Sequence, residues 1–267
     1  MKGFLRIFLF MGLMLTDIIA FTIFLNLNTD IATFLSSNPF LLVAISELVF
    51  IFPALPLYLL ITKQNLKDVL PLKPIGWKNV AYIALMSFLL EPITSLLSAL
   101  TSIFYPNAAM EIAAMFTLDN LPAALIALAV LPSLVEEICF RGAILNASKG
   151  MSVMHAVIIN GVLFGLIHMN LQQIPYALFL GVIFSLYVIY TKSIYSSILA
   201  HFLVNAPNVL LALTLSADLE PALSVDELLP SLGVLAISAV LFFICFLSVF
   251  KRFRLYNLYR NPIQGPN

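Results

Sequence analysis

Long apolar stretches recur along this chain, and each is close to the roughly 20 residues that a membrane-spanning helix needs. Hydrophobic residues make up 62% of the 267 residues and charged residues only 10%, whereas a soluble domain carries about a quarter charged residues. We therefore predict an all-α fold, a polytopic transmembrane helix bundle of about eight helices. The predicted helices cover residues 5–26, 40–62, 79–103, 121–147, 153–169, 174–190, 194–213 and 230–250.

The first stretch resembles a signal peptide, because Lys2 and Arg6 precede an apolar run. That run, residues 8–25, is long for a signal peptide and has no convincing small-x-small cleavage site, so we expect a retained helix. The chain shows no internal repeat and no low-complexity linker. We therefore expect one integral membrane domain, residues 1–267, with its functional motifs in residues 121–210.

Basic residues are distributed very unevenly over the predicted loops. If the N-terminus is cytoplasmic, all 13 basic residues fall on the cytoplasmic side and seven acidic residues fall in the outer loops. Such segregation follows the positive-inside rule and predicts that both termini are cytoplasmic. The outer acidic residues are Asp30, Glu111, Asp119, Asp218, Glu220, Asp226 and Glu227.

Three short polar motifs stand inside the later apolar stretches. They are EEICFR at 136–141, FGLIH at 164–168 and HFLVN at 201–205. An ionisable group costs roughly 2.5 to 3.5 kcal/mol at the centre of a membrane helix on insertion scales. Two adjacent carboxylates and two imidazoles in such stretches therefore favour a buried, polar, hydrolytic site.

Helix spacing suggests how the first motif is arranged. Residues four apart lie on one helix face, so Glu137 and Arg141 are expected to pair. Glu136 projects about 100° away from Glu137 and is left free to face a cavity. Burial beside another carboxylate should raise the pKa of Glu136, as a general base requires.

The other two motifs supply the remaining polar groups of the predicted site. His168 and His201 can donate, accept or bind metal at working pH, and Asn205 offers an amide donor suited to a developing oxyanion. Counted along the helices, Glu136, His201 and Asn205 lie at similar depths, roughly 10 to 16 Å from the cytoplasmic helix ends. His168 is deeper, about 22 Å, unless its helix is tilted or starts higher.

Several nearby residues have ordinary structural explanations. Gly161 and Gly165 form a G-x-x-x-G pair that lets another helix approach closely. We expect Asn160 either to line the cavity or to bond between helices. Cys139 has acidic neighbours, which disfavour a reactive thiolate. Structural roles are also expected for four further polar residues: Asp17, Glu47, Glu91 and His155.

Together the motifs resemble the signatures of a known family. EEICFRG is similar to the E-E-x-x-x-R signature of the type II CAAX prenyl endopeptidase family, the bacterial CPBP or Abi group of intramembrane proteases. FGLIH resembles its F-x-x-x-H motif and HFLVN its H-x-x-x-N/D motif, in the same order. The resemblance covers about residues 120 to 210.

The resemblance implies an endopeptidase whose chamber opens towards the cytoplasm. It implies that Glu136 and His168 activate water, and that His201 with Asn205 stabilises the tetrahedral oxyanion. Glu137 and Arg141 occupy the remaining signature positions as supporting residues. Glu136, His168 and His201 could also hold Zn²⁺, since one carboxylate and two imidazoles can form a catalytic zinc site. A metal-free mechanism stays equally open.

We therefore expect a multi-pass protein of the plasma membrane that cleaves a peptide or protein substrate beside membrane lipid, with no nucleic-acid partner. Two alternatives remain. The polar residues could form a proton or ion relay in an ion-coupled transporter, or the chain could be a non-catalytic immunity or scaffold protein. Nothing in the sequence names the substrate, a prenyl group, the oligomeric state or the pathway.

Overall fold

The computed structural model describes residues 2–215 and 225–252, and within these ranges it consists of helices and the turns between them, with no strand. Six helical segments are long and apolar enough to cross a membrane. The predicted all-α, polytopic bundle is therefore confirmed. The first two of these segments run from Gly3 to Leu27 and from Pro39 to Thr62.

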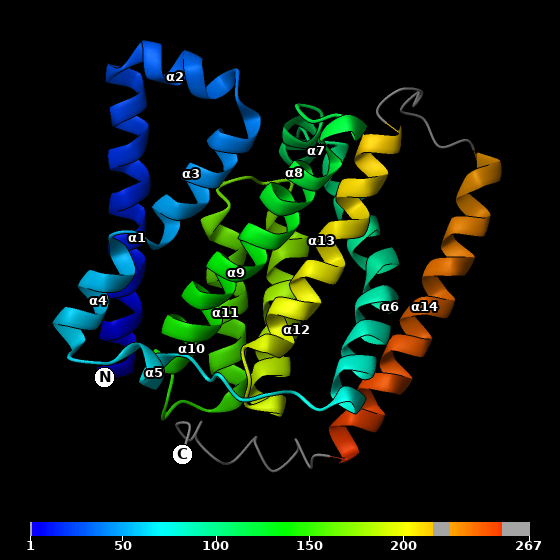
Figure 1. The fold of residues 1–267 in the computed structure, drawn as a ribbon. Coiled ribbons are helices and arrows are strands. Elements are labelled where there is room, and N and C mark those ends of the chain that lie inside the picture. Colours follow the sequence, from blue (N-terminus) through cyan, green and yellow to red (C-terminus); the bar gives the residue numbers. More distant parts are fainter. Residues whose placement is uncertain (1, 216–224, 253–267) are drawn as a thin grey trace.

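The N-terminal helices form one side of the bundle, seen at the left of Figure 1. A single long helix rises, a short helix turns the chain, and two further helices descend beside it (Figure 1). Phe10 of the first helix packs edge-to-face on Tyr58 at a centroid distance of 5.1 Å, and both rings are buried. These elements are α1 (Lys2–Leu27), α2 (Thr29–Ser36), α3 (Pro39–Ile51), α4 (Ala54–Thr62) and α5 (Leu66–Val69).

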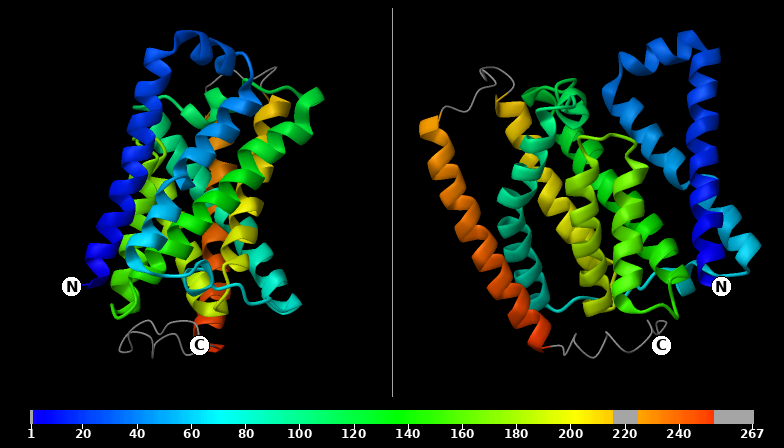
Figure 2. Two further views of the ribbon diagram at one scale, coloured as in Figure 1. Left: turned by 60° about the vertical axis from the view of Figure 1, so that its left-hand side comes forward. Right: turned by 180° about the vertical axis from the view of Figure 1, so that it is seen from behind.

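The remaining helices form the larger part of the bundle, which Figure 2 shows from two further directions. A long helix, α6, packs against both α13 and α14. In chain order these elements are α6 (Trp77–Ser102), α7 (Ala108–Ala113), η1 (Leu118–Asn120), α8 (Leu121–Leu125), η2 (Ile126–Val130), α9 (Leu131–Glu137), η3 (Ile138–Ile144), α10 (Leu145–Ala147), α11 (Val153–Ile167), α12 (Ile174–Thr191), α13 (Tyr195–Leu215) and α14 (Val225–Arg252).

Each of the eight predicted stretches corresponds to helical structure, with three differences from the expected form. The stretch 40–62 is divided into α3 and α4 by a turn at Phe52 and Pro53. The stretch 121–147 is helical throughout, but two of its segments, η2 and η3, are π-helical. The fifth helix, α11, has 15 residues and is therefore only about 22 Å long, less than the hydrocarbon thickness of a bilayer. It is one of two apolar helices that are too short to count among the six candidate spans.

Helices α11 and α12 pack closely because glycines face each other between them. A Cβ atom on Gly161 would stand 2.9 Å from the carbonyl oxygen of Leu178, and one on Gly165 would stand 3.0 Å from that of Ile174. A Cβ on Gly181 would come within 2.7 Å of Gly161 Cα. The helix-packing role predicted for the G-x-x-x-G pair is confirmed.

The start of α1 and the end of α14 lie at the same end of the bundle (Figure 1). The connections α4–α6, α10–α11 and α12–α13 lie at that end too, whereas α2 and α7 lie at the opposite end (Figures 1 and 2). These three connections are the basic ones in the sequence. The bundle therefore has the charge asymmetry on which the prediction of cytoplasmic termini rests.

Candidate active site

A buried ion pair lies at the centre of the bundle. Arg141 Nη1 donates to Glu137 Oε1 at 2.8 Å, and neither side chain is exposed. Arg141 Nη2 donates to the carbonyl oxygen of Gly181 on α12 at 3.0 Å. The guanidinium also lies over the Phe164 ring, 4.4 Å from its centroid, and 5.3 Å from that of Phe184. The pairing predicted from helix spacing is confirmed.

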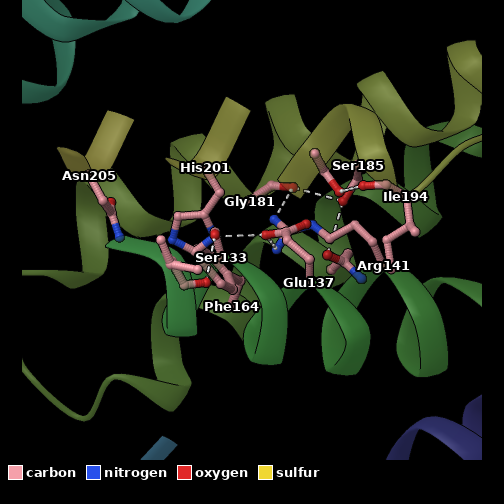
Figure 3. Close-up of polar contacts among 12 residues, drawn as sticks. Ser133, Glu137, Arg141, Phe164, Gly181, Ser185, Ile194, His201 and Asn205 are labelled. Atoms are coloured by element: carbon pink, nitrogen blue, oxygen red, sulfur yellow. Dashed lines mark hydrogen bonds and ion pairs between the residues drawn. The ribbon is translucent and has the colours of Figure 1, made fainter. Parts of the chain in front are cut away.

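The same carboxylate oxygen joins the first motif to the third. His201 Nδ1 lies 3.0 Å from Glu137 Oε1, and the imidazole is buried (Figure 3). A carboxylate paired with Arg141 is ionised and can only accept, so His201 donates from Nδ1. In the neutral ring Nε2 is therefore a free acceptor. Glu137 fixes both the orientation and the tautomer of His201.

Phe164 brings the second motif to the same place. Its ring centroid lies 5.1 Å from that of His168 and 6.0 Å from that of His201, edge-to-face in both cases. His168 Nδ1 donates to the Phe164 carbonyl oxygen at 2.7 Å. His168 therefore also keeps Nε2 as an acceptor in its neutral form. The two imidazoles pack on one phenyl ring, although their depths along the helices were expected to differ.

Glu136 is buried, with 8% of its surface exposed. Its Oε2 has no hydrogen-bond partner in the described structure. The carboxylate of Glu47 on α3 also has an unpartnered buried oxygen and lies within electrostatic range of Glu136. The structure places Glu136 on the motif helix without a hydrogen bond to the other predicted site residues.

Asn205 on α13 donates a hydrogen bond to a backbone carbonyl of the segment 121–147, which carries the first motif. Pro132 has no N–H group, so it cannot donate to the carbonyl oxygen of Leu128, four residues earlier. Asn205 Nδ2 donates to that oxygen at 3.3 Å instead. Leu128 lies within π-helical η2, and Cys139 and Arg141 lie within η3. Short π-helical segments are rare and frequently occur at functional sites.

Two contributors to this site lay outside the sequence motifs. The carbonyl oxygen of Gly181 accepts from both Arg141 and Ser185, the latter at 2.7 Å. Ser185 Oγ also lies 2.9 Å from Asn160 Oδ1, so its one proton is shared between these two acceptors, and Asn160 donates to the Phe140 carbonyl oxygen at 2.7 Å. Asn160 therefore bonds between helices, one of its two predicted roles. Gly181 carried no sequence signal beyond its position in an apolar helix.

Three of the residues expected to be structural have contacts of that kind. Asp17 accepts from the backbone N–H of Ala54 at 2.8 Å. His155 bonds to Ser152 at the start of α11. Cys139 is fully buried and its Sγ lies 3.8 Å from the Phe50 carbonyl oxygen. These contacts leave the three motifs as the candidate site.

A metal would need several donor side chains around one point. Among the described residues, which include all the predicted ligands, no three His, Cys, Asp or Glu side chains form a group that could hold a metal ion. Glu136, His168 and His201 do not fit a zinc site in this arrangement. Zinc therefore has no role in the chemistry that this arrangement supports, and zinc binding stays a prediction from the sequence.

The comparison with protein families agrees with this site. Residues 118–207 match the family model described as type II CAAX prenyl endopeptidase Rce1-like. The matched segment contains all three motifs and the helices η1 to α13 that position them. A search of the curated proteins and a search of the solved structures each gave no match. The predicted family resemblance is confirmed by this match.

Proposed function

We propose that this integral membrane protein, whose residues 118–207 match the Rce1-like type II CAAX prenyl endopeptidases, is an intramembrane endopeptidase. It would hydrolyse a peptide bond at the cytoplasmic side of the membrane with water activated by Glu136 and His168. The observation that carries the proposal is the bond between Glu137 and His201. That bond brings two motifs 64 residues apart in sequence onto one buried carboxylate.

The hydrogen bonds suggest a division of labour between the two histidines. His168 keeps its Nε2 lone pair, because Nδ1 donates to a backbone carbonyl. That lone pair, with the unpartnered carboxylate of Glu136, is suited to accept a proton from water as it attacks the scissile carbonyl. The accepted proton would then pass to the leaving amine when the C–N bond breaks.

Stabilisation of the oxyanion falls to His201 and Asn205 in this mechanism. His201 can donate from Nε2 only as an imidazolium, in which Nδ1 keeps its bond to the carboxylate of Glu137. Asn205 would exchange its bond to the Leu128 carbonyl for one to the oxyanion. A preorganised donor of this kind is worth about 10² to 10³ in kcat.

The substrate that we propose is a peptide or protein segment at the membrane surface, with or without a prenyl group. The plasma membrane is the proposed location. Phe164 and Phe184 form an apolar wall beside the imidazoles, with His201 5.3 Å from the Phe184 ring. Such a wall excludes water from the charged groups and strengthens their interactions.

The test is cleavage of quenched fluorescent peptides by the full-length protein in liposomes, with matched prenylated and unprenylated peptides. We expect the wild type to cleave and Glu136→Gln to lose about 10² to 10⁴ of the rate. Glu111→Gln, which changes an exposed carboxylate on α7, is the control and should leave the rate unchanged. Full activity of Glu136→Gln would overturn the mechanism.

The same liposomes distinguish the alternative functions. Solute or proton flux without cleavage would favour an ion-coupled transporter, and a cellular phenotype that survives both Glu136→Gln and His168→Ala would favour a non-catalytic scaffold. Cleavage measured with and without a chelator tests the prediction of zinc. The water activation by Glu136 and His168 proposed above predicts activity that persists in the chelator, because no three described donor side chains are grouped closely enough to hold a metal ion. Loss of activity in the chelator, restored by Zn²⁺, would favour the zinc mechanism instead.

A further inference from the structure

The loop that follows His168 is fastened to α6 by one fully buried side chain. Gln172 Nε2 lies 2.8 Å from Ser98 Oγ and 3.1 Å from Ser102 Oγ. In the same contact, Thr101 Oγ1 lies 2.9 Å from the backbone carbonyl oxygen of Gln172 and 2.9 Å from that of Leu97 in its own helix, and these carbonyls share its one proton. These bonds join a loop and a helix that lie 70 residues apart in the sequence. The Gln172 amide is buried, and its Oε1 has no hydrogen-bond partner in the described structure, so loss of the Nε2 bonds would leave the whole amide unpaired, which is costly.

The loop at residues 169–173 follows His168 directly and therefore constrains the position of its side chain. Helix α11 ends at Ile167, and His168 is its C-cap residue. Met169 follows in a left-handed backbone conformation with a φ of 49°. Asn170 then closes the turn, since its Oδ1 accepts from the Gln172 backbone N–H at 2.8 Å. His168 is thus four residues and one closed turn from the anchor at Gln172.

Helix α6 also holds the helix that carries the third motif. Glu91 Oε2 accepts from Asn208 Nδ2 at 3.1 Å. Asn208 lies one turn beyond Asn205 on α13, and Glu91 lies two turns before Ser98 on α6. One face of α6 therefore contacts both the loop after His168 and the helix of Asn205.

We propose that Gln172 is a positioning residue, which fixes His168 relative to His201 and Asn205 by anchoring its loop to α6. The inference rests on the proposed endopeptidase function for its kinetic consequence. It does not make Gln172 a catalytic residue, because the side chain is bonded to Ser98 and Ser102 and not to the histidines.

The test uses two variants of the full-length protein and one control. Gln172→Met keeps the size of the side chain and removes its hydrogen bonds, and the double variant Ser98→Ala/Ser102→Ala removes the two hydroxyl partners. Ser87→Ala is the control, because Ser87 also lies on α6, is fully buried as Gln172 is, and its hydroxyl donates to the Ile83 carbonyl oxygen of its own helix.

Two experiments are carried out on each protein. The first measures kcat and KM for a cleaved peptide. The second uses mass spectrometry to measure the rate at which diethyl pyrocarbonate modifies each histidine. His155 is exposed and calibrates the reagent, while the buried His201 reports on the fold.

For Gln172→Met we expect kcat to fall by about 10² at unchanged KM, because a misplacement near 1 Å costs that much. His168 should be modified faster, with His201 unchanged. The double variant should change in the same direction and Ser87→Ala should match the wild type. Wild-type kcat and His168 reactivity in either variant would overturn the inference, as would equal increases at His168 and His201. If the wild type cleaves no peptide, the proposed function fails, and the His168 rate still tests the anchor.

Discussion

His201 Nδ1 lies 3.0 Å from the Oε1 of Glu137, the oxygen that also accepts from Arg141 at 2.8 Å. One buried carboxylate oxygen therefore accepts hydrogen bonds both from the guanidinium of Arg141 and from the imidazole of His201. Each of the three side chains depends on the other two, because an unpaired charge in this interior would cost several kcal/mol. The first and third motifs are thus parts of one electrostatic unit.

This unit predicts the effect of removing the carboxylate charge. Glu137→Gln leaves Arg141 buried without a counter-ion, and breaking such a pair costs about 3 to 5 kcal/mol. We expect a lower free energy of unfolding in detergent and no proteolysis. The double variant Glu137→Gln/Arg141→Met removes both charges and should recover most of the stability but none of the activity. Equal stability of the single and double variants would contradict this account.

The contact between Asn205 and Leu128 predicts a separation of stability from activity. Asn205→Ala loses one hydrogen bond, worth about 1 kcal/mol of unfolding free energy, and one donor to the oxyanion, worth about 10² to 10³ in kcat. Pro132→Ala restores an N–H group that can donate to the Leu128 carbonyl. The double variant should therefore regain stability while kcat stays low, as chemical unfolding and peptide cleavage would measure. Recovery of kcat with stability would show that Asn205 has only a structural role.

Cys139 provides a prediction of no effect. The thiol is fully buried, with its Sγ 3.8 Å from the Phe50 carbonyl oxygen, and its acidic neighbours disfavour a reactive thiolate. Cys139→Ala should retain proteolysis. Thiol reagents should inactivate this variant and the wild type to the same extent. Loss of cleavage in this variant with an intact fold would return a thiol mechanism to consideration.

Helix positions and the Glu137–Arg141 pair could be predicted because each follows from a short-range pattern. Apolar length predicts a span, and a separation of four residues predicts a shared helix face. The depth of His168 could be predicted less well, since counting residues assumes parallel helices of equal length. Helix α11 is short and ends at His168, so the imidazole packs on Phe164 beside His201.

Other parts of the site depend on contacts that no local pattern encodes. The two π-helical segments change the direction of side chains around Glu136, and their sequences are ordinary apolar runs apart from Arg141. The hydrogen bond from Arg141 to the Gly181 carbonyl depends on the packing of α12 beside the helices of the first and second motifs. Gln172 lies between the predicted helices 153–169 and 174–190, and its contact with α6 is visible only in the structure. Each required the tertiary arrangement.

That close packing of α11 on α12 supports a final prediction. A methyl group at Gly161 would stand 2.6 Å from Val182 Cγ2 and 2.9 Å from the Leu178 carbonyl oxygen. The side chain could shift, but the backbone oxygen could move only with α12. Because Gly181 on α12 accepts from Arg141, that movement would also lengthen a bond of the buried ion pair.

Gly161→Ala should therefore lower the free energy of unfolding by about 1 to 3 kcal/mol, the usual cost of overpacking, and reduce kcat as well. Gly12→Ala is the matched control, since Gly12 lies within α1 and its new methyl would meet no atom within 4 Å. This control should be as stable as the wild type or more so, because alanine favours a helix over glycine by up to about 1 kcal/mol. If Gly161→Ala matched Gly12→Ala in both stability and cleavage, the contact between α11 and α12 would not be what holds Gly181 against Arg141.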